Sequence, residues 1–173
     1  FMVLPSFDFA EEYSTNVFYQ DERSKNVVTD FVSHYKPGVA IKSDWSRHAL
    51  NLSFDSDITE YSRFANQANY QDLKTKVDGR LDFTRDSYLA SSFAYNSLHE
   101  SRGSVDQAGG IGPTFYDNKL IDTHYSQKFN RVTLKTGVDT VRYDYDNVLT
   151  SLGNILQMSS RNHWEYSPSI RVG

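Results

Sequence analysis

Residues 72–83 read Asp-Leu-Lys-Thr-Lys-Val-Asp-Gly-Arg-Leu-Asp-Phe, and this stretch decides the fold class. Its odd-numbered positions are uncharged and mostly apolar. Its even-numbered positions are all charged, namely Asp72, Lys74, Lys76, Asp78, Arg80 and Asp82. A strand places alternate residues on opposite faces, whereas a helix would scatter these charges around its circumference. The stretch is therefore predicted to be a β-strand with one charged face and one apolar face.

The same alternation recurs along the whole chain and predicts about eight strands of roughly 10 to 14 residues each. Strands of soluble domains cluster near 5 or 6 residues, while a tilted strand that crosses a membrane needs about 9 to 11. The lengths therefore favour membrane-spanning strands. Besides 72–83, the predicted strands cover residues 3–13, 29–42, 48–61, 88–99, 119–129, 132–145 and 162–172, the first and last with the weakest alternation.

The predicted connections alternate strictly between short and long. Short turns are expected at 44–47, 85–87 and 130–131, and long polar loops at 14–28, 62–71, 100–114 and 146–160. Outer-membrane barrels combine short periplasmic turns with longer external loops in this way. Pro37 lies inside a predicted strand and cannot donate to a central ladder, so a bulge or a strand end is expected there.

Composition excludes other classes. The chain has 173 residues, a net charge of -4 and a mean hydropathy of -0.60, and no window supplies the roughly 20 apolar residues that a membrane helix needs. A barrel with a polar interior can have this composition, because polar and lipid-facing residues alternate. Cysteine is absent, which rules out disulfides and thiolate chemistry, and no basic surface indicates nucleic acid as a partner.

Alternation with one polar face also describes a soluble β-sandwich or a lipocalin-like barrel, and the sequence leaves this alternative open. In those folds the charged face would lie outside and the apolar face inside. In a membrane barrel the two assignments are exchanged.

Several short motifs resemble the putative β-barrel porin type 2 family. They are Lys42–Leu50 (KSDWSRHAL), Asp78–Asp82 (DGRLD) with Arg85-Asp86, Leu98–Ser104 (LHESRGS) with Pro113-Thr114 and Tyr116-Asp117, and Arg142–Asp146 (RYDYD). The resemblance runs from about residue 17 to 171. It implies an all-β, antiparallel transmembrane barrel in a bacterial outer membrane, in contact with lipid and lipopolysaccharide, and associated with exopolysaccharide export. Family members are typically longer than this chain. We therefore expect residues 1–173 to be a single, partial barrel domain, and the strand pattern that stops at 169–173 agrees.

Nine charged residues are predicted to line the lumen of such a barrel, where rings of charge would tune selectivity. They are the six even-numbered residues of 72–82 together with Lys128, Lys135 and Asp139. They could equally pair with neighbouring strands and only stabilise the wall. Five aromatic residues near predicted strand ends are expected at the membrane interface, because Trp and Tyr favour that position. They are Trp45, Tyr61, Tyr70, Tyr88 and Trp164.

No catalytic residue, metal ligand or cofactor is predicted. The five histidines show no metal-binding spacing, and neither a nucleophile elbow nor a phosphate loop is present. The leading interpretation is a pore for a polar solute or a polysaccharide. The alternatives are a structural or anchoring barrel that contacts other envelope proteins, and an outer-membrane hydrolase.

Overall fold

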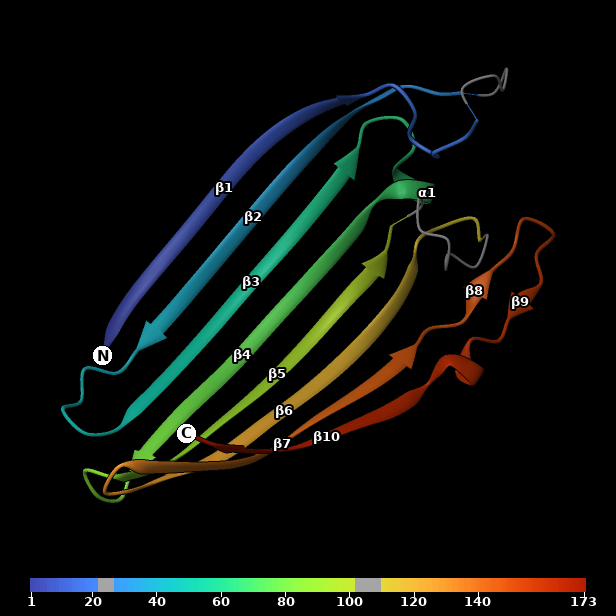
Figure 1. Ribbon diagram of the computed structural model, residues 1–173. Coiled ribbons are helices and arrows are strands. Elements are labelled where there is room, and N and C mark those ends of the chain that lie inside the picture. The colour runs from blue at the N-terminus through green and yellow to red at the C-terminus, as the bar shows by residue number, and fades with distance from the viewer. Residues whose placement is uncertain (22–26, 102–109) are drawn as a thin grey trace.

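Eight long strands form one antiparallel sheet in the computed structural model, which describes residues 1–21, 27–101 and 110–173 (Figure 1). Each strand pairs with the preceding one in the chain, so the sheet is a simple meander, except that the last place is taken by β10 instead of β8. The strands are β1 (Met2–Ser14), β2 (Asp30–Lys42), β3 (Ala49–Tyr61), β4 (Tyr70–Asp82), β5 (Ser87–Glu100), β6 (Thr114–Phe129), β7 (Val132–Tyr145) and β10 (His163–Val172).

The structure confirms the predicted strands, mostly to within one or two residues at each end. The largest difference is the start of β6, which was expected at Lys119 and lies at Thr114. The cause is its partner strand, because β5 continues to Glu100 and Glu100 pairs with Thr114. Strand pairing thus extended a segment whose own alternation is weak.

Short and long connections lie at opposite ends of the sheet (Figure 1). The turns after β2, β4 and β6 are short, as predicted. The long connections contain α1 (Ala65–Ala68), the small ladder of β8 (Val148–Leu149) with β9 (Ile155–Leu156), and η1 (Ser159–Arg161). Parts of the predicted loops 14–28 and 100–114 lie outside the described residues. Within the described ranges, no helix is long and apolar enough to cross a membrane.

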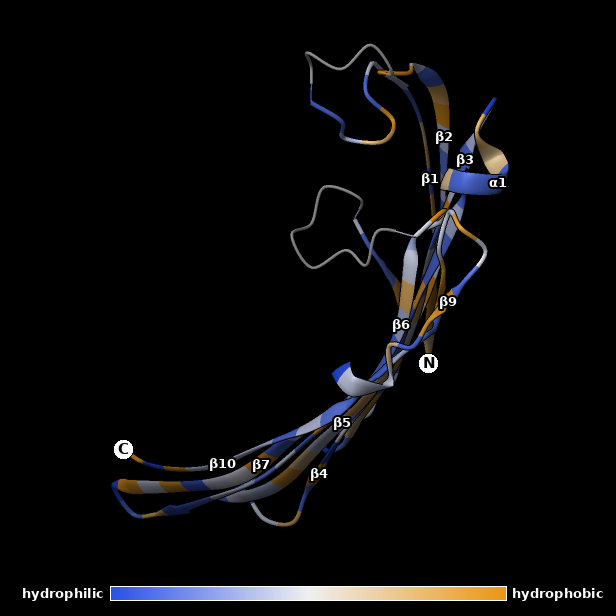
Figure 2. Cartoon of the chain, turned by 90° about the vertical axis from the view of Figure 1, so that its right-hand side faces the viewer, coloured by the Kyte–Doolittle hydropathy of each residue, from blue (hydrophilic) through white to orange (hydrophobic). Residues whose placement is uncertain are grey.

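The sheet is a single curved layer, as its edge-on view shows (Figure 2). No ladder joins β1 to β10, so the sheet is open along both edges. Among the described residues, few apolar side chains are buried, and they lie near the long connections: Val17, Val32, Ala68, Val148 and Met158. Within the described ranges, no second layer packs against the apolar face of the sheet.

The structure has neither a bulge nor a strand end at Pro37, contrary to expectation. It lies within β2 and pairs with Phe7 of β1. On the other side, the β2–β3 ladder is interrupted between Tyr35–Ile58 and Gly38–Asp55. Because the register is the same before and after the gap, no residue is inserted, and the strand continues although proline cannot donate a backbone hydrogen bond.

Candidate functional site

The two faces of the sheet differ in chemistry. Cross-strand pairing aligns one residue from each strand into a row, and two neighbouring rows show the contrast. One row, on the apolar face, contains Val3, Ile41, Leu52, Val77, Phe93, Ile121, Thr140 and Tyr166. The next row, one residue away and on the charged face, contains Met2, Lys42, Asn51, Asp78, Ser92, Asp122, Asp139 and Ser167. Moving one residue along each strand thus leads from the apolar face to the polar face.

The apolar face is uncovered across all eight strands. Phe7 is 64% exposed on β1, Phe93 is 46% exposed on β5, and Ile170 is 73% exposed on β10. Soluble monomers rarely expose a continuous apolar surface of this extent. An apolar band around a strand wall is the surface that transmembrane barrels present to lipid.

The apolar face becomes polar toward the long connections. There Tyr95 donates its hydroxyl hydrogen to the Asp117 carboxylate at 2.8 Å. Asp144 accepts from two cations, with its oxygens 3.4 Å from Lys119 Nζ and 2.6 Å from Arg142 Nη2. These four charged residues mark one border of the apolar band.

The two tryptophans lie on the apolar face near its opposite borders. Trp164 lies beside the polar border, with Arg142 Cζ 5.4 Å from its ring centroid. Trp45 lies in the β2–β3 turn, in edge contact with the ring of Phe1 at 5.3 Å, and lines a shallow apolar hollow with Leu50 and Leu81. Their placement at a membrane interface stays a prediction.

Tyr61, Tyr70 and Tyr88, also predicted at the membrane interface, lie on the charged face of the sheet. Tyr70 pairs with Thr59, and Tyr88 pairs with Asp82, which places all three tyrosines on the charged face. The prediction used their closeness to strand ends alone. Parity along the strand decides the face, and these three residues share the parity of the charges.

All nine residues predicted to line a lumen lie on the charged face. Lys135 pairs with Ser126, which pairs with Tyr88, so the charged face continues from β4 through β7. Asp139 pairs with Asp122, and Lys128 follows Ser126 by two residues. The structure thus brings the nine side chains onto one surface.

Several of these charges are paired along or across the strands. Lys76 Nζ lies 3.6 Å from Asp78, and the Arg80 guanidinium donates to Asp82 at 2.7 and 2.9 Å. Both cations are about half exposed, and ion pairs in water contribute only about 0–1 kcal/mol to stability. The pairs therefore add little to the stability of the wall, and their charged groups remain exposed on this face.

The charged face is hollowed as well as polar. An open hollow of about 300 Å³ extends across β1–β4 and is lined by Asp8, Lys36, Asp55, Asp57, Asp72 and Lys74, together with Ser6, Pro37 and Ser56. Lys36 Nζ lies 3.0 Å from Asp57 within it. An open, charged hollow of this kind can hold ions or a hydroxylated solute against the sheet.

A row of rings lies on the charged face at the end with the long connections. We call it the loop-end aromatic row, and it consists of Tyr61, Tyr70, Tyr116, Tyr143, Tyr145 and His163. Tyr116 stacks on Tyr145 with centroids 5.2 Å apart, and Tyr143 stacks on His163 at 4.8 Å. The sequence analysis placed Tyr61 and Tyr70 near strand ends without joining them to the other rings, and the parity of the six residues on their strands is the signal that groups them.

The histidines and carboxylates form local pairs. His99 stacks on Tyr70 and has Nδ1 2.8 Å from Asp72, while His124 Nδ1 lies 3.3 Å from Asp122. In the described part of the chain, no group of three or more His, Cys, Asp or Glu side chains is arranged to hold a metal ion. The geometry of this face suits solute contact along a surface.

Comparison with known proteins gives one match. A sequence model of the family described as "Putative beta-barrel porin 2" matches residues 1–173. No curated protein and no solved structure matches the chain.

Proposed function

The chain belongs to the β-barrel porin 2 family, and from this membership we propose that its sheet forms part of the wall of an outer-membrane channel for a polar solute. Porins are membrane-embedded barrels, so the apolar face is the surface toward lipid and lipopolysaccharide, and the charged face is the surface toward the lumen. The wall involves no chemical step. Its geometry and charge would select what passes.

One observation carries this proposal: the uncovered apolar face and the charged face alternate residue by residue over eight long strands. A soluble sandwich with this pattern would bury its apolar face under a second layer. The described residues provide no such layer, since the apolar side chains of the sheet are exposed. Lipid is the environment that would cover them.

The open edges of the sheet imply further strands in the complete wall. β1 and β10 each present a row of backbone groups without a ladder partner on one side. Inside a bilayer each unsatisfied group costs several kcal/mol, so barrels close. We propose that additional strands of the same barrel pair with both edges.

A polysaccharide is the solute that we propose. The loop-end aromatic row offers ring faces that can pack against the apolar faces of sugar rings, while tyrosine hydroxyls and nearby carboxylates can bond sugar hydroxyls. Glu100 lies at this end and is held by the Arg161 guanidinium. The row therefore combines stacking surfaces with fixed polar partners.

The face assignment is tested by single cysteines at adjacent positions, because residues 1–173 contain none and any cysteine outside them can be replaced by serine. In full-length protein in vesicles, Lys76→Cys should react with a membrane-impermeant maleimide and Val77→Cys should not. Labelling of Val77→Cys alone would exchange the two faces and overturn the channel proposal.

The channel itself is tested by heat-dependent gel mobility of the protein from outer membranes, followed by conductance in planar bilayers. A mobility change on boiling together with a steady current is expected. A mobility change without current would favour a plugged, anchoring barrel. A single mobility with the protein in the soluble fraction would contradict the membrane wall.

A further inference from the structure

Charge is distributed unevenly along the charged face from one end of the strands to the other. At the short-turn end, the last four residues of the strands contribute one acidic residue, Asp82, and five basic residues: Lys42, Arg80, Lys128, Lys135 and Arg171. At the opposite end, the last four residues contribute no lysine or arginine to this face and five acidic residues: Glu12, Asp30, Asp72, Glu100 and Glu165.

Two of the five acidic residues at this end are paired with arginines. Asp30 is 1% exposed and accepts the backbone N–H groups of Arg63 and Phe64, while the Arg63 side chain lies 3.5 Å away. Glu100 is paired with Arg161, and Asp72 bonds the backbone N–H of His99. The opposite, short-turn end has five basic residues against one acidic residue and therefore carries an excess of positive charge.

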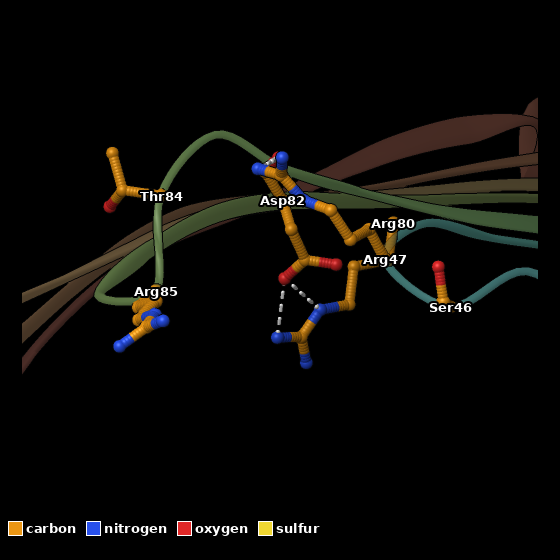
Figure 3. Close-up of a pocket in the computed structure, with 6 residues that line it drawn as sticks. All are labelled: Ser46, Arg47, Arg80, Asp82, Thr84 and Arg85. Atoms are coloured by element: carbon orange, nitrogen blue, oxygen red, sulfur yellow. Dashed lines mark hydrogen bonds and ion pairs between the residues drawn. The ribbon is translucent and has the colours of Figure 1, made fainter.

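The basic end contains a hollow of about 700 Å³ that two turns and one strand surround (Figure 3). Its lining is Ser46, Arg47, Arg80, Asp82, Thr84 and Arg85. Asp82 is the one carboxylate among three guanidinium groups, and it forms an ion pair with Arg80.

The other two arginines keep their charge uncompensated. Arg47 donates to the backbone carbonyls of Asp82 and Phe83, at 3.4 and 3.3 Å, which orients the guanidinium without neutralising it. Arg85 is exposed on the adjacent β4–β5 turn and has no ion pair with the described residues. Figure 3 shows both side chains around the same hollow as the Arg80–Asp82 pair.

The basic surface continues along the wall toward β10. Tyr88 has the Arg80 guanidinium over its ring at 3.9 Å and Lys135 Nζ at 5.9 Å from the same centroid. Lys135 and Arg171 then line a second hollow of about 290 Å³. We call the basic residues of this end, Lys42, Arg47, Arg80, Arg85, Lys128, Lys135 and Arg171, the basic rim.

We infer that the basic rim is a binding site for the acidic groups of an anionic solute, with Arg47 and Arg85 making the first contacts. This inference rests on the proposed channel and names the charge of what passes through it. Guanidinium groups bind carboxylate, sulfate and phosphate through paired N–H donors. A cluster of positively charged side chains in a hollow also raises the local concentration of an anionic solute. The aromatic row at the far end would then contact the neutral part of the same solute.

The test uses the full-length channel in planar bilayers, with dextran sulfate and uncharged dextran of equal length as probes. Dextran sulfate should block the current, and the Arg47→Gln/Arg85→Gln variant should need about tenfold more of it. This variant keeps the Arg80–Asp82 ion pair, and unchanged heat-dependent gel mobility shows that it folds. Lys119→Gln is the matched control, because it removes a positive charge from the apolar face. Dextran sulfate should block its current at the same concentration as in the wild type.

Several results distinguish this site from the channel function. Equal block by both dextrans, or an unchanged block in the double variant, overturns the site and leaves the channel standing. Absence of current overturns the channel. In that case the site is tested by binding of the folded, detergent-solubilised protein to immobilised dextran sulfate. Retention of the wild type, with weaker retention of the double variant, would still support the site. The block should weaken between about 0.1 M and about 1 M salt, as screening shortens the range of the charges.

Discussion

Gly137 is a position where one methyl group should measurably destabilise the wall. It lies on β7 opposite His124, and a Cβ atom there would meet both His124 Cβ and the carbonyl oxygen of Thr123 at 2.9 Å. Neither atom can rotate away, because one is backbone and the other is attached directly to it. The β6–β7 pairing would have to shift, and overpacking of this kind costs about 1–3 kcal/mol.

Gly79 provides the matched control within the same sheet. Its added Cβ would have the Ala49 carbonyl oxygen at 3.7 Å and Leu50 Cδ1 at 4.0 Å, which are ordinary contacts. Replacing glycine with alanine at such a position typically stabilises by about 0.4–1 kcal/mol through the unfolded state. We therefore expect Gly137→Ala to be less stable than Gly79→Ala by about 2 kcal/mol or more.

The assay is equilibrium urea unfolding of the full-length protein in lipid vesicles, followed by tryptophan fluorescence. Gly137→Ala should unfold at lower urea than the wild type, and Gly79→Ala at equal or higher urea, with similar slopes. If Gly137→Ala unfolds at the same urea concentration as Gly79→Ala, the close approach of β6 and β7 at this position is refuted.

Three further predictions concern other parts of the sheet. Asp30→Ala should lower the free energy of unfolding by about 2–3 kcal/mol, because three backbone N–H groups lose a buried acceptor; Asp30→Asn, which keeps one acceptor oxygen, should lose less, and a wild-type urea midpoint for Asp30→Ala would contradict this role. The Lys36–Asp57 pair is partly exposed, so a double-mutant cycle with Lys36→Met and Asp57→Asn should give a coupling below about 1 kcal/mol; a much larger value would mean that water does not reach this hollow. With any tryptophan outside residues 1–173 replaced by phenylalanine, brominated lipids should quench the remaining tryptophan in both Trp45→Phe and Trp164→Phe; no quenching in either variant would remove that tryptophan from the lipid-facing surface.

Strand positions and faces were predictable from single segments. In residues 72–83 the alternation of charged and uncharged positions is complete, and it needs no partner strand to be recognised. Consecutive side chains of a strand point to opposite faces, so parity alone placed all nine predicted lumen residues on one surface. The interface prediction for Tyr88 used its position along the strand alone, and parity adds that its side chain lies on the charged face.

The start of β6 could not be predicted in the same way. Residues 114–118 alternate poorly, and they become strand because β5 supplies backbone partners up to Glu100. Pro37 is a similar case. Its pairing with Phe7 on one side keeps β2 continuous while the ladder to β3 is interrupted.

The sequence by itself determined the class of this protein: long alternating strands, with turns and loops in strict succession and a polar face opposite the apolar one. These properties are local, since they depend on the direction of successive side chains along one strand. The tertiary structure alone decided which charges meet. Arg47, Arg80 and Arg85 come from a turn, a strand and another turn, and the register of β3 against β4 and of β4 against β5 brings them around one hollow. Backbone hydrogen bonds between strands fix that register, and no single segment contains them.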